Sequence, residues 1–154
     1  MCTFFIGDYM DDFYMNEALI EAKKAYDCGE VPIGAVIVDN NGIVSRAHNT
    51  KDSNKCAIFH AEVNAIIEAT KQKKNWRLSD CVMYVTLLPC PMCASAISQS
   101  RIKRVVYGTN NDNVDKGLIY SIFNAKNSNI VEITGGILEN TCGKLLKDFF
   151  SEKR

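Results

Sequence analysis

Two short polar clusters constrain the fold of this chain more than any other feature. The first is His60-Ala61-Glu62, and the second, further along the chain, is Pro89-Cys90-Pro91-Met92-Cys93. One imidazole and two thiolates are ligands of the kind that zinc prefers, and three protein ligands leave the fourth tetrahedral position open for water. If these residues bind one ion, the fold must bring the start of one helix against the start of another.

Glu62 adds a catalytic group to this ligand set. The pattern His-x-Glu followed by Pro-Cys-x-x-Cys matches the signature of zinc-dependent nucleobase deaminases. Zinc lowers the pKa of bound water from about 15.7 toward about 7, and a neighbouring carboxylate can carry the released proton to a ring nitrogen and leaving amine. The sequence therefore predicts a hydrolytic deaminase with one Zn²⁺ per chain, held by His60, Cys90 and Cys93, with Glu62 as the catalytic residue.

Other interpretations of single residues remain open at this point. Cys90 and Cys93 alone would also suit a closed zinc site or a thioredoxin-like redox pair, but neither role requires a glutamate beside the ligand. His48 is interpreted as an ordinary hairpin residue rather than a fourth ligand. The carboxamide of Asn49 can offer a donor and an acceptor to a base edge, or it can stabilise a turn.

The periodicity of apolar residues predicts alternating helices and strands, and hence an α/β fold. A β-hairpin is expected around the turn residues Asp39 to Gly42, and a helix is expected to begin at Pro91, a favoured first helical position. The expected helices are 13–27, 61–71, one beginning at residue 91, 118–125 and 137–150, and the expected strands are 33–38, 43–47, 82–88, 104–107 and 130–133.

Length and composition favour a single cytoplasmic domain. The 154 residues suit one hydrophobic core, so we expect a single zinc-dependent deaminase domain over residues 1–154, with residues 1–9 an unstructured extension if Met10 is the true start. There is no long apolar run and no signal-peptide pattern, so neither a membrane segment nor secretion is expected. Seven cysteines, an odd number and mostly scattered singly, indicate reduced thiols.

Charge gives no general argument for a nucleic-acid partner, because 18 basic and 18 acidic residues cancel. Local basic clusters are compatible either with RNA contacts or with a solvated surface. These clusters are Lys71, Lys73, Lys74 and Arg77; Arg101, Lys103 and Arg104; and Lys144, Lys147, Lys153 and Arg154.

Further segments resemble the bacterial tRNA-specific adenosine deaminases over nearly the whole chain. They are Glu30 to Val36, His48-Asn49, the two metal clusters, Tyr84-Val85-Thr86, Arg101 to Gly108, Val131 to Leu138 and Leu145 to Phe150. The resemblance implies a three-layer α/β/α cytidine-deaminase-like fold with a central mixed sheet, and a homodimer that converts the wobble adenosine of a tRNA anticodon loop to inosine. It also implies that substrate is bound by Glu30, Val31, Pro32, Asn49 and Ala61.

The sequence departs from this family at three places. Bulky Phe59 stands where a small residue is usual, and Leu88 stands where the family usually has an acidic residue before Pro-Cys. The segment Thr109 to Lys116 is polar and longer than its family counterpart. Two alternatives therefore accompany the main prediction: a deaminase of a free base or nucleoside such as guanine or cytosine, and a zinc-retaining binding subunit without activity.

Overall fold

A five-stranded sheet organises the molecule. The computed structural model describes residues 2–126 and 129–153. The strand order is β2-β1-β3-β4-β5. The strands are β1 (Gly34–Asp39), β2 (Gly42–His48), β3 (Val82–Leu87), β4 (Arg104–Thr109) and β5 (Glu132–Thr134), and the helices are α1 (Cys2–Asp27), α2 (Ala61–Lys73), α3 (Pro91–Gln99), α4 (Lys116–Phe123) and α5 (Glu139–Glu152).

The sheet is mixed. Strand β1 is antiparallel to both β2 and β3, whereas β3, β4 and β5 run parallel to one another. Parallel neighbours need a crossover, and α3 and α4 supply the two crossovers. The mixed sheet agrees with the prediction from sequence.

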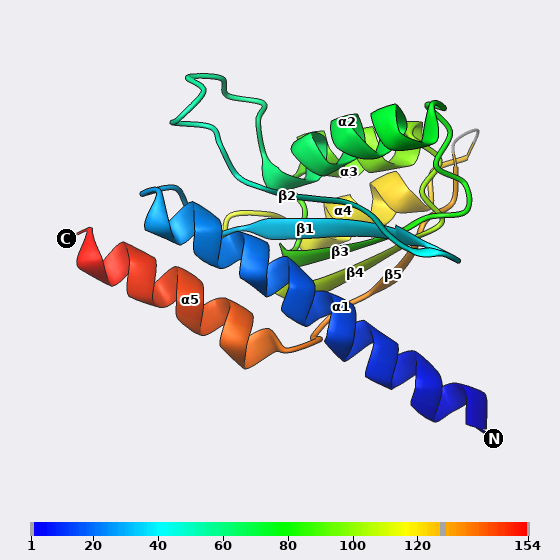
Figure 1. Ribbon diagram of the computed structural model, residues 1–154, viewed down its shortest axis with the longest axis horizontal. Helices are drawn as coiled ribbons and strands as arrows, with labels where there is room; N and C mark the ends of the chain where they lie inside the picture. The colour runs from blue at the N-terminus through cyan, green and yellow to red at the C-terminus, as the bar shows by residue number, and fades with distance from the viewer. Residues whose placement is uncertain (1, 127–128, 154) are drawn as a thin grey trace.

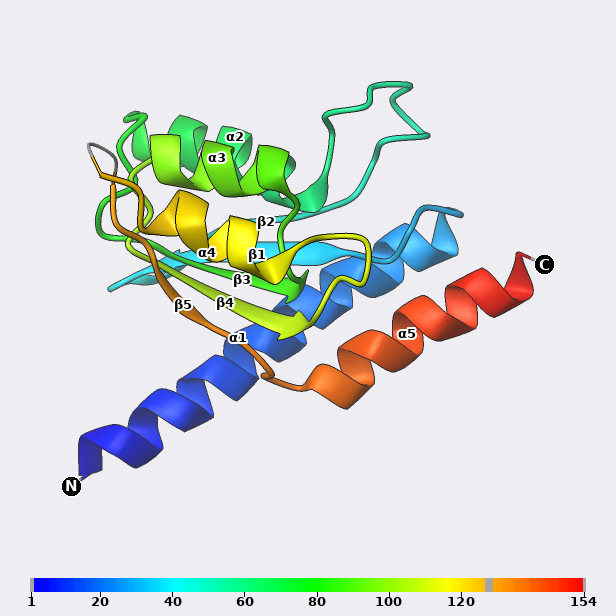
Figure 2. The same ribbon diagram turned by 180° about the vertical axis from the view of Figure 1, so that it is seen from behind.

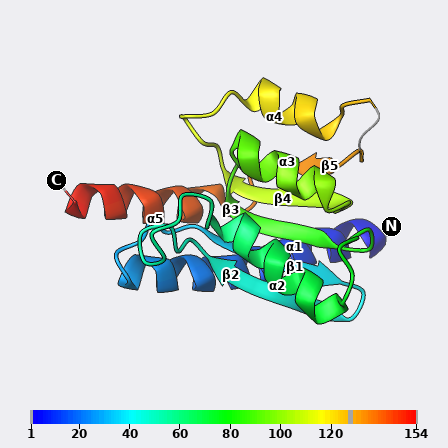
Figure 3. The same ribbon diagram turned by 90° about the horizontal axis from the view of Figure 1, so that it is seen from above.

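Helices cover both faces of the sheet (Figures 1 and 2). Helices α2, α3 and α4 lie side by side over one face (Figure 3), and α1 and α5 lie on the other. Strand β1 alternates between the two cores: Ala35 and Ile37 pack with the α2–α4 layer, and Val36 and Val38 pack with α1. Strands buried on both faces require near-continuous apolar runs. The three-layer α/β/α prediction is confirmed.

Helix α1 differs most from its predicted bounds. We expected a helix from Phe13, with residues 1–9 an unstructured extension if Met10 is the true start, whereas α1 begins at Cys2, and its first turns project beyond the sheet (Figure 1). The prediction relied on the periodicity of apolar residues, which arises where a helix packs against a sheet. The first turns of α1 extend beyond the sheet, so this signal is missing there. The predicted start of this helix at Phe13 was therefore wrong. Residue 1 lies outside the described residues.

A buried polar cluster fixes α1 to the sheet. The Asp11 carboxylate accepts a hydrogen bond from the Tyr84 hydroxyl at 2.7 Å and two from the Arg104 guanidinium at 3.0 and 2.9 Å. Arg104 also donates to the Thr134 hydroxyl at 3.1 Å. Burial raises the pKa of Tyr84, and the hydrogen bond to Asp11 raises it further. The hydrogen bonds to Asp11 also raise the pKa of Arg104. This cluster, Asp11, Tyr84, Arg104 and Thr134, joins α1 to β3, β4 and β5.

Two further expectations concern thiols and membranes. The cysteines with described side chains, Cys28, Cys56, Cys81, Cys90, Cys93 and Cys142, are all free. The side chain of Cys2 lies outside the described part. Among residues 2–126 and 129–153, no helix has the length and apolar character needed to cross a membrane.

Candidate metal centre

The predicted metal-ligating residues sit at the starts of two helices. His60 is the N-cap of α2, and Cys90 is the N-cap of α3, each with an extended backbone. Pro91 follows at the first position of α3, where its fixed φ and missing N–H suit a helix start. Cys93 lies in the first turn of the same helix. Since α2 and α3 lie side by side over the sheet (Figure 3), the three side chains converge.

The ligand atoms have the spacing that zinc requires. His60 Nδ1 lies 3.7 Å from Cys90 Sγ and 3.5 Å from Cys93 Sγ, and the three ligand atoms all lie within 4.8 Å of one another. Zinc–nitrogen and zinc–sulfur bonds of about 2.0 and 2.3 Å in a tetrahedron place N and S about 3.5 Å apart. Both the donor chemistry and the distances therefore fit a tetrahedral ion with one open position.

The local environment favours a thiolate at Cys90. A hydrogen bond from the Cys93 side chain lowers the pKa of Cys90 to about 5, with help from the backbone N–H groups of Cys93 and Met92 and from His60. The same contact with Cys90 raises the pKa of the buried Cys93 thiol. Exposed N–H groups at a helix start stabilise an anionic sulfur.

Glu62 lies beside this centre without belonging to the ligand set. It is in the first turn of α2 and is only 4% exposed. Burial raises the pKa of its carboxyl to about 7, opposed by its own backbone N–H, and its side chain is hydrogen-bonded to Cys93. A carboxyl group that titrates near neutral pH can both accept and donate a proton.

Asn49 lies at the end of β2, where the chain enters the loop 50–59. It is 6% exposed. Its Nδ2 donates to the Val31 carbonyl at 3.3 Å, and its Oδ1 accepts from the Lys51 N–H at 3.1 Å. The structure therefore brings Asn49 and Val31 into contact, with Pro32 buried beside Val31.

Glu30 and Ala61 occupy less accessible positions than expected for substrate contacts. Glu30 is 1% exposed, and its two carboxylate oxygens accept hydrogen bonds from Asp52 N–H, Ser53 N–H and Ser53 Oγ at 2.6 to 3.3 Å. It anchors the loop 50–59. Ala61 is fully buried and belongs to the hydrophobic core.

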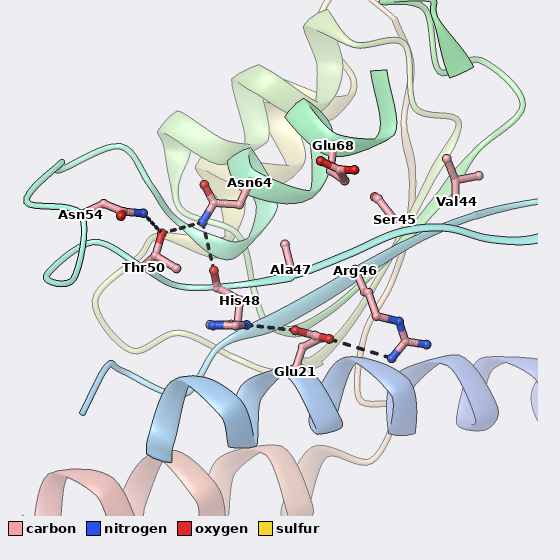
Figure 4. Close-up of a pocket in the computed structure, with 10 residues that line it drawn as sticks. All are labelled: Glu21, Val44, Ser45, Arg46, Ala47, His48, Thr50, Asn54, Asn64 and Glu68. Atoms are coloured by element: carbon pink, nitrogen blue, oxygen red, sulfur yellow. Dashed lines mark hydrogen bonds and ion pairs between the residues drawn. The ribbon is translucent and has the colours of Figure 1, made fainter. Parts of the chain in front are cut away.

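The remaining residues singled out from sequence have structural partners. His48 and Glu21 point toward each other, with Nδ1 2.9 Å from Oε2 (Figure 4), and His48 is outside the metal cluster, as predicted. Leu88 is 1% exposed and belongs to the hydrophobic core, so an apolar contact stands where the family usually has an acidic group. Phe59 is half-buried at the base of the loop 50–59.

A groove borders the segment Thr109 to Lys116. It has a volume of about 470 Å³ and extends from Val31 and Leu87, along residues 109–113, to Lys147 and Phe150 on α5. Val31 is the residue that Asn49 contacts, and Leu87 ends the strand that leads to Cys90. The groove therefore begins near Asn49 and at the end of β3.

The basic clusters predicted from sequence are partly neutralised. Lys73 pairs with Asp39 and Asp80, Arg104 pairs with Asp11, and Lys144 pairs with Asp148. The fold brings Lys73 and Arg104 to their partners, whereas Asp148 lies one turn after Lys144 on α5. Lys147 faces the groove, and Arg154 lies outside the described residues.

One polar residue near Asn49 was not singled out from the sequence. Asn64 is one turn into α2, and its side chain donates hydrogen bonds to the chain on both sides of Asn49. Asparagine is unfavourable inside helices because it competes for backbone hydrogen bonds. An asparagine at this position was therefore a signal that could have been noticed.

Comparison with known proteins agrees with this description. Residues 10–154 match the family model described as MafB19-like deaminase. The chain is similar to a solved structure from a study of A-to-I editing by tRNA:A34 deaminases at the wobble position, with a TM-score of 0.80 and 31% identity over 86% of this chain and 98% of that one. It also shares its fold, at 17% identity and a TM-score of 0.81, with a guanine deaminase from Nitrosomonas europaea. Fold and site thus define a deaminase.

Curated relatives identify the family more narrowly. The chain is 44% identical to the tRNA-specific adenosine deaminase of Bacillus subtilis, over 94% of this chain and 91% of that protein. It is 40% identical to the tRNA-specific adenosine deaminase of Streptococcus pyogenes serotype M1, over 92% of this chain and 84% of that protein. The chain belongs to the family of tRNA-specific adenosine deaminases.

Proposed function

We propose that this protein is a single zinc-dependent deaminase domain that converts adenosine to inosine at the wobble position of a tRNA anticodon. The observation that supports this most strongly is the convergence of His60, Cys90 and Cys93 beside buried Glu62. In this proposal, the three residues hold one Zn²⁺ per chain.

Proton transfer is assigned to Glu62. When bound, zinc would act as a Lewis acid and lower the pKa of the attacking water. Glu62 accepts the proton of that water and delivers it to the purine N1, and a proton then passes to the leaving amine. The bond between C6 and the amine nitrogen breaks, a carbonyl forms at C6, and ammonia leaves.

Substrate recognition is assigned to Asn49 and the segment that it contacts. Asn49 has unused hydrogen-bonding capacity, since its amide has a second N–H and its Oδ1 a second lone pair. We assign the base contact to this carboxamide, with Val31 and Pro32 lining the pocket. The groove that leads to Lys147 and Phe150 offers a cation and an aromatic ring to the anticodon loop, which suits a single-stranded RNA segment.

The protein is also proposed to act in the cytoplasm as a homodimer. Large exposed apolar side chains occur in the α2–α4 layer and just before it, where an interface would bury them. They are Ile58, Ile67, Met92 and Leu118. Light scattering after gel filtration tests the dimer, and a monomeric mass at micromolar concentration would contradict it.

The experiment for the proposed function compares substrates. Wild-type protein is incubated with tRNA transcripts that carry adenosine at the wobble position, and inosine is read as guanosine after reverse transcription. Guanine, cytosine and free adenosine are tested in parallel by ammonia release. Activity on small molecules alone would instead establish a free-base or nucleoside deaminase, and zinc retention without activity would establish a binding subunit.

Glu62→Ala tests the mechanism within that experiment. The variant should retain zinc and lose turnover, because Glu62 carries protons and binds no metal. Glu68→Ala is the matched control, since Glu68 is on the same helix and its carboxylate accepts an exposed hydrogen bond from Gln72. Full activity of Glu62→Ala would refute the mechanism.

A further inference from the structure

Asn64 lies between the loop that carries Asn49 and the helix that carries the metal centre. Its Nδ2 lies 3.0 Å from the His48 carbonyl and 3.0 Å from Thr50 Oγ1 (Figure 4), and 3.4 Å from the Phe59 carbonyl. His48 and Thr50 are the neighbours of Asn49 on either side, and Phe59 immediately precedes His60. One amide group therefore contacts the chain around both functional positions.

Asn64 is itself rigidly held. Its backbone N–H donates to the His60 carbonyl at 3.0 Å, so its Cα moves with the first turn of α2. That turn contains Glu62 and begins at His60. A displacement of α2 would consequently carry Asn64 with it, together with the proposed metal ligand and the proposed proton carrier.

The acceptors of Asn64 are also fixed among themselves. The Thr50 N–H donates to the Phe59 carbonyl at 3.1 Å and closes the base of the loop 50–59. Asn54 Nδ2 donates to Thr50 Oγ1 at 2.9 Å from within the loop. Thr50 thus receives one hydrogen bond from the loop and one from α2, and transmits the position of the helix to the residue next to Asn49.

We propose that Asn64 is a positioning residue that sets the carboxamide of Asn49 relative to the metal centre. This inference rests on the proposed function, in which Asn49 contacts the adenine and Glu62 moves the proton. The reacting atoms must meet within a few tenths of an ångström, and a misplacement of about 1 Å costs about 100-fold in rate. Asn64 acts through Asn49 and does not itself contact the substrate.

A double-mutant cycle on the zinc-loaded protein tests this role. Asn64→Ala should lower kcat/KM for wobble-adenosine tRNA by about 10- to 100-fold, mainly through kcat. In an Asn49→Ala background the same change should cost less than about 3-fold, because the group that Asn64 positions has been removed. Asn64→Asp keeps the shape of the side chain but replaces its donors with an acceptor, and should match Asn64→Ala. Gln72→Ala, an exposed amide on the same helix, should leave kcat/KM unchanged.

Two measurements are independent of activity. Zinc content should stay at one ion per chain in every Asn64 variant, because none of the ligands changes. Amide hydrogen exchange at Lys51 should accelerate, because its N–H bonds to Asn49 Oδ1 and loses protection when Asn49 shifts. Acceleration at Lys51 without a change in the exchange of the sheet amides would show that the effect is local.

The outcomes separate this inference from the proposed function. Equal losses of kcat/KM in both backgrounds, or unchanged exchange at Lys51, would overturn the positioning role. If the wild-type protein deaminates no tRNA, the proposed function fails, and the exchange at Lys51 in Asn64→Ala and Asn64→Asp still decides whether Asn64 positions Asn49.

Discussion

Replacing Asp11 with alanine should release α1 from the sheet. The carboxylate is 8% exposed and accepts three hydrogen bonds, one from Tyr84 and two from Arg104. The substitution leaves the guanidinium without its carboxylate and the Tyr84 hydroxyl without an acceptor in a buried position. Both consequences destabilise the folded state, because buried polar groups without partners lose their hydration without compensation.

The size of the effect follows from the exposure of the partners. Removing one partner of a buried ion pair costs about 3–5 kcal/mol. The Arg104 side chain remains 24% exposed and keeps its bond to Thr134, so water and Thr134 partly replace Asp11. We therefore expect Asp11→Ala to lower the free energy of unfolding by about 3 kcal/mol, the lower end of this range. In a protein of this size that corresponds to a decrease in Tm of about 6–12 °C.

Thermal and urea denaturation of the zinc-loaded protein measure this loss. Asp12→Ala is the matched control, since Asp12 is the next residue on α1 and is exposed. Arg104→Met should cost less in the Asp11→Ala background than in the wild type, because the pair is already broken. A loss below about 1 kcal/mol, similar to that of Asp12→Ala, would refute the reasoning, since it would fall in the range of an exposed ion pair.

Three other expectations concern separate parts of the molecule. Cys93→Ala should reduce both zinc content by mass spectrometry and Tm, because the ion joins two helix starts; full zinc occupancy would contradict the ligand set. Burial acts to raise the pKa of Glu21, but its contacts with His48 and Lys24 outweigh burial, so the pKa is lowered. The stabilisation by Glu21 is therefore present above about pH 4.5 and is lost as pH falls further, so Glu21→Gln should flatten the decline in unfolding free energy between about pH 5 and 3; an unchanged decline would count against this. Gly34→Ala should strongly lower Tm, because its Cβ would lie 2.0 Å from the Ala18 carbonyl oxygen; a wild-type Tm would show that α1 can shift.

The parts of the fold that sequence predicted well depend on local signals. The turn at residues 39–42 contains its own turn residues, so β1 and β2 begin and end within about one residue of their expected bounds, and Pro91 fixes the start of α3 at the expected residue. The metal cluster was predictable because its spacing places ligands at helix starts. These signals lie within a few residues of the structures they determine.

The parts that were missed depend on contacts between distant segments. Arg104 belonged to an expected basic cluster, but its partner Asp11 is 93 positions away and on another layer. Likewise, the hydrogen bonds that Glu30 accepts from Asp52 and Ser53 in the loop 50–59 span 22 and 23 positions and could not be foreseen from the sequence, whereas its expected contact with substrate stays a prediction. Charge counted along a sequence cannot distinguish a free cation from one whose partner is supplied by the fold.

The proposed reaction chemistry and the proposed base recognition belong to different segments of the chain. The proposed metal ligands and proton carrier belong to helices α2 and α3, which are packed into the core, whereas Asn49 stands at the entry to a loop that side-chain hydrogen bonds from Glu30 and Asn64 hold in place. Under the proposed function, substitutions within the exposed part of that loop would alter which base is accepted without changing a metal ligand. A protein of this architecture can therefore change substrate through a handful of loop residues while its reaction stays the same.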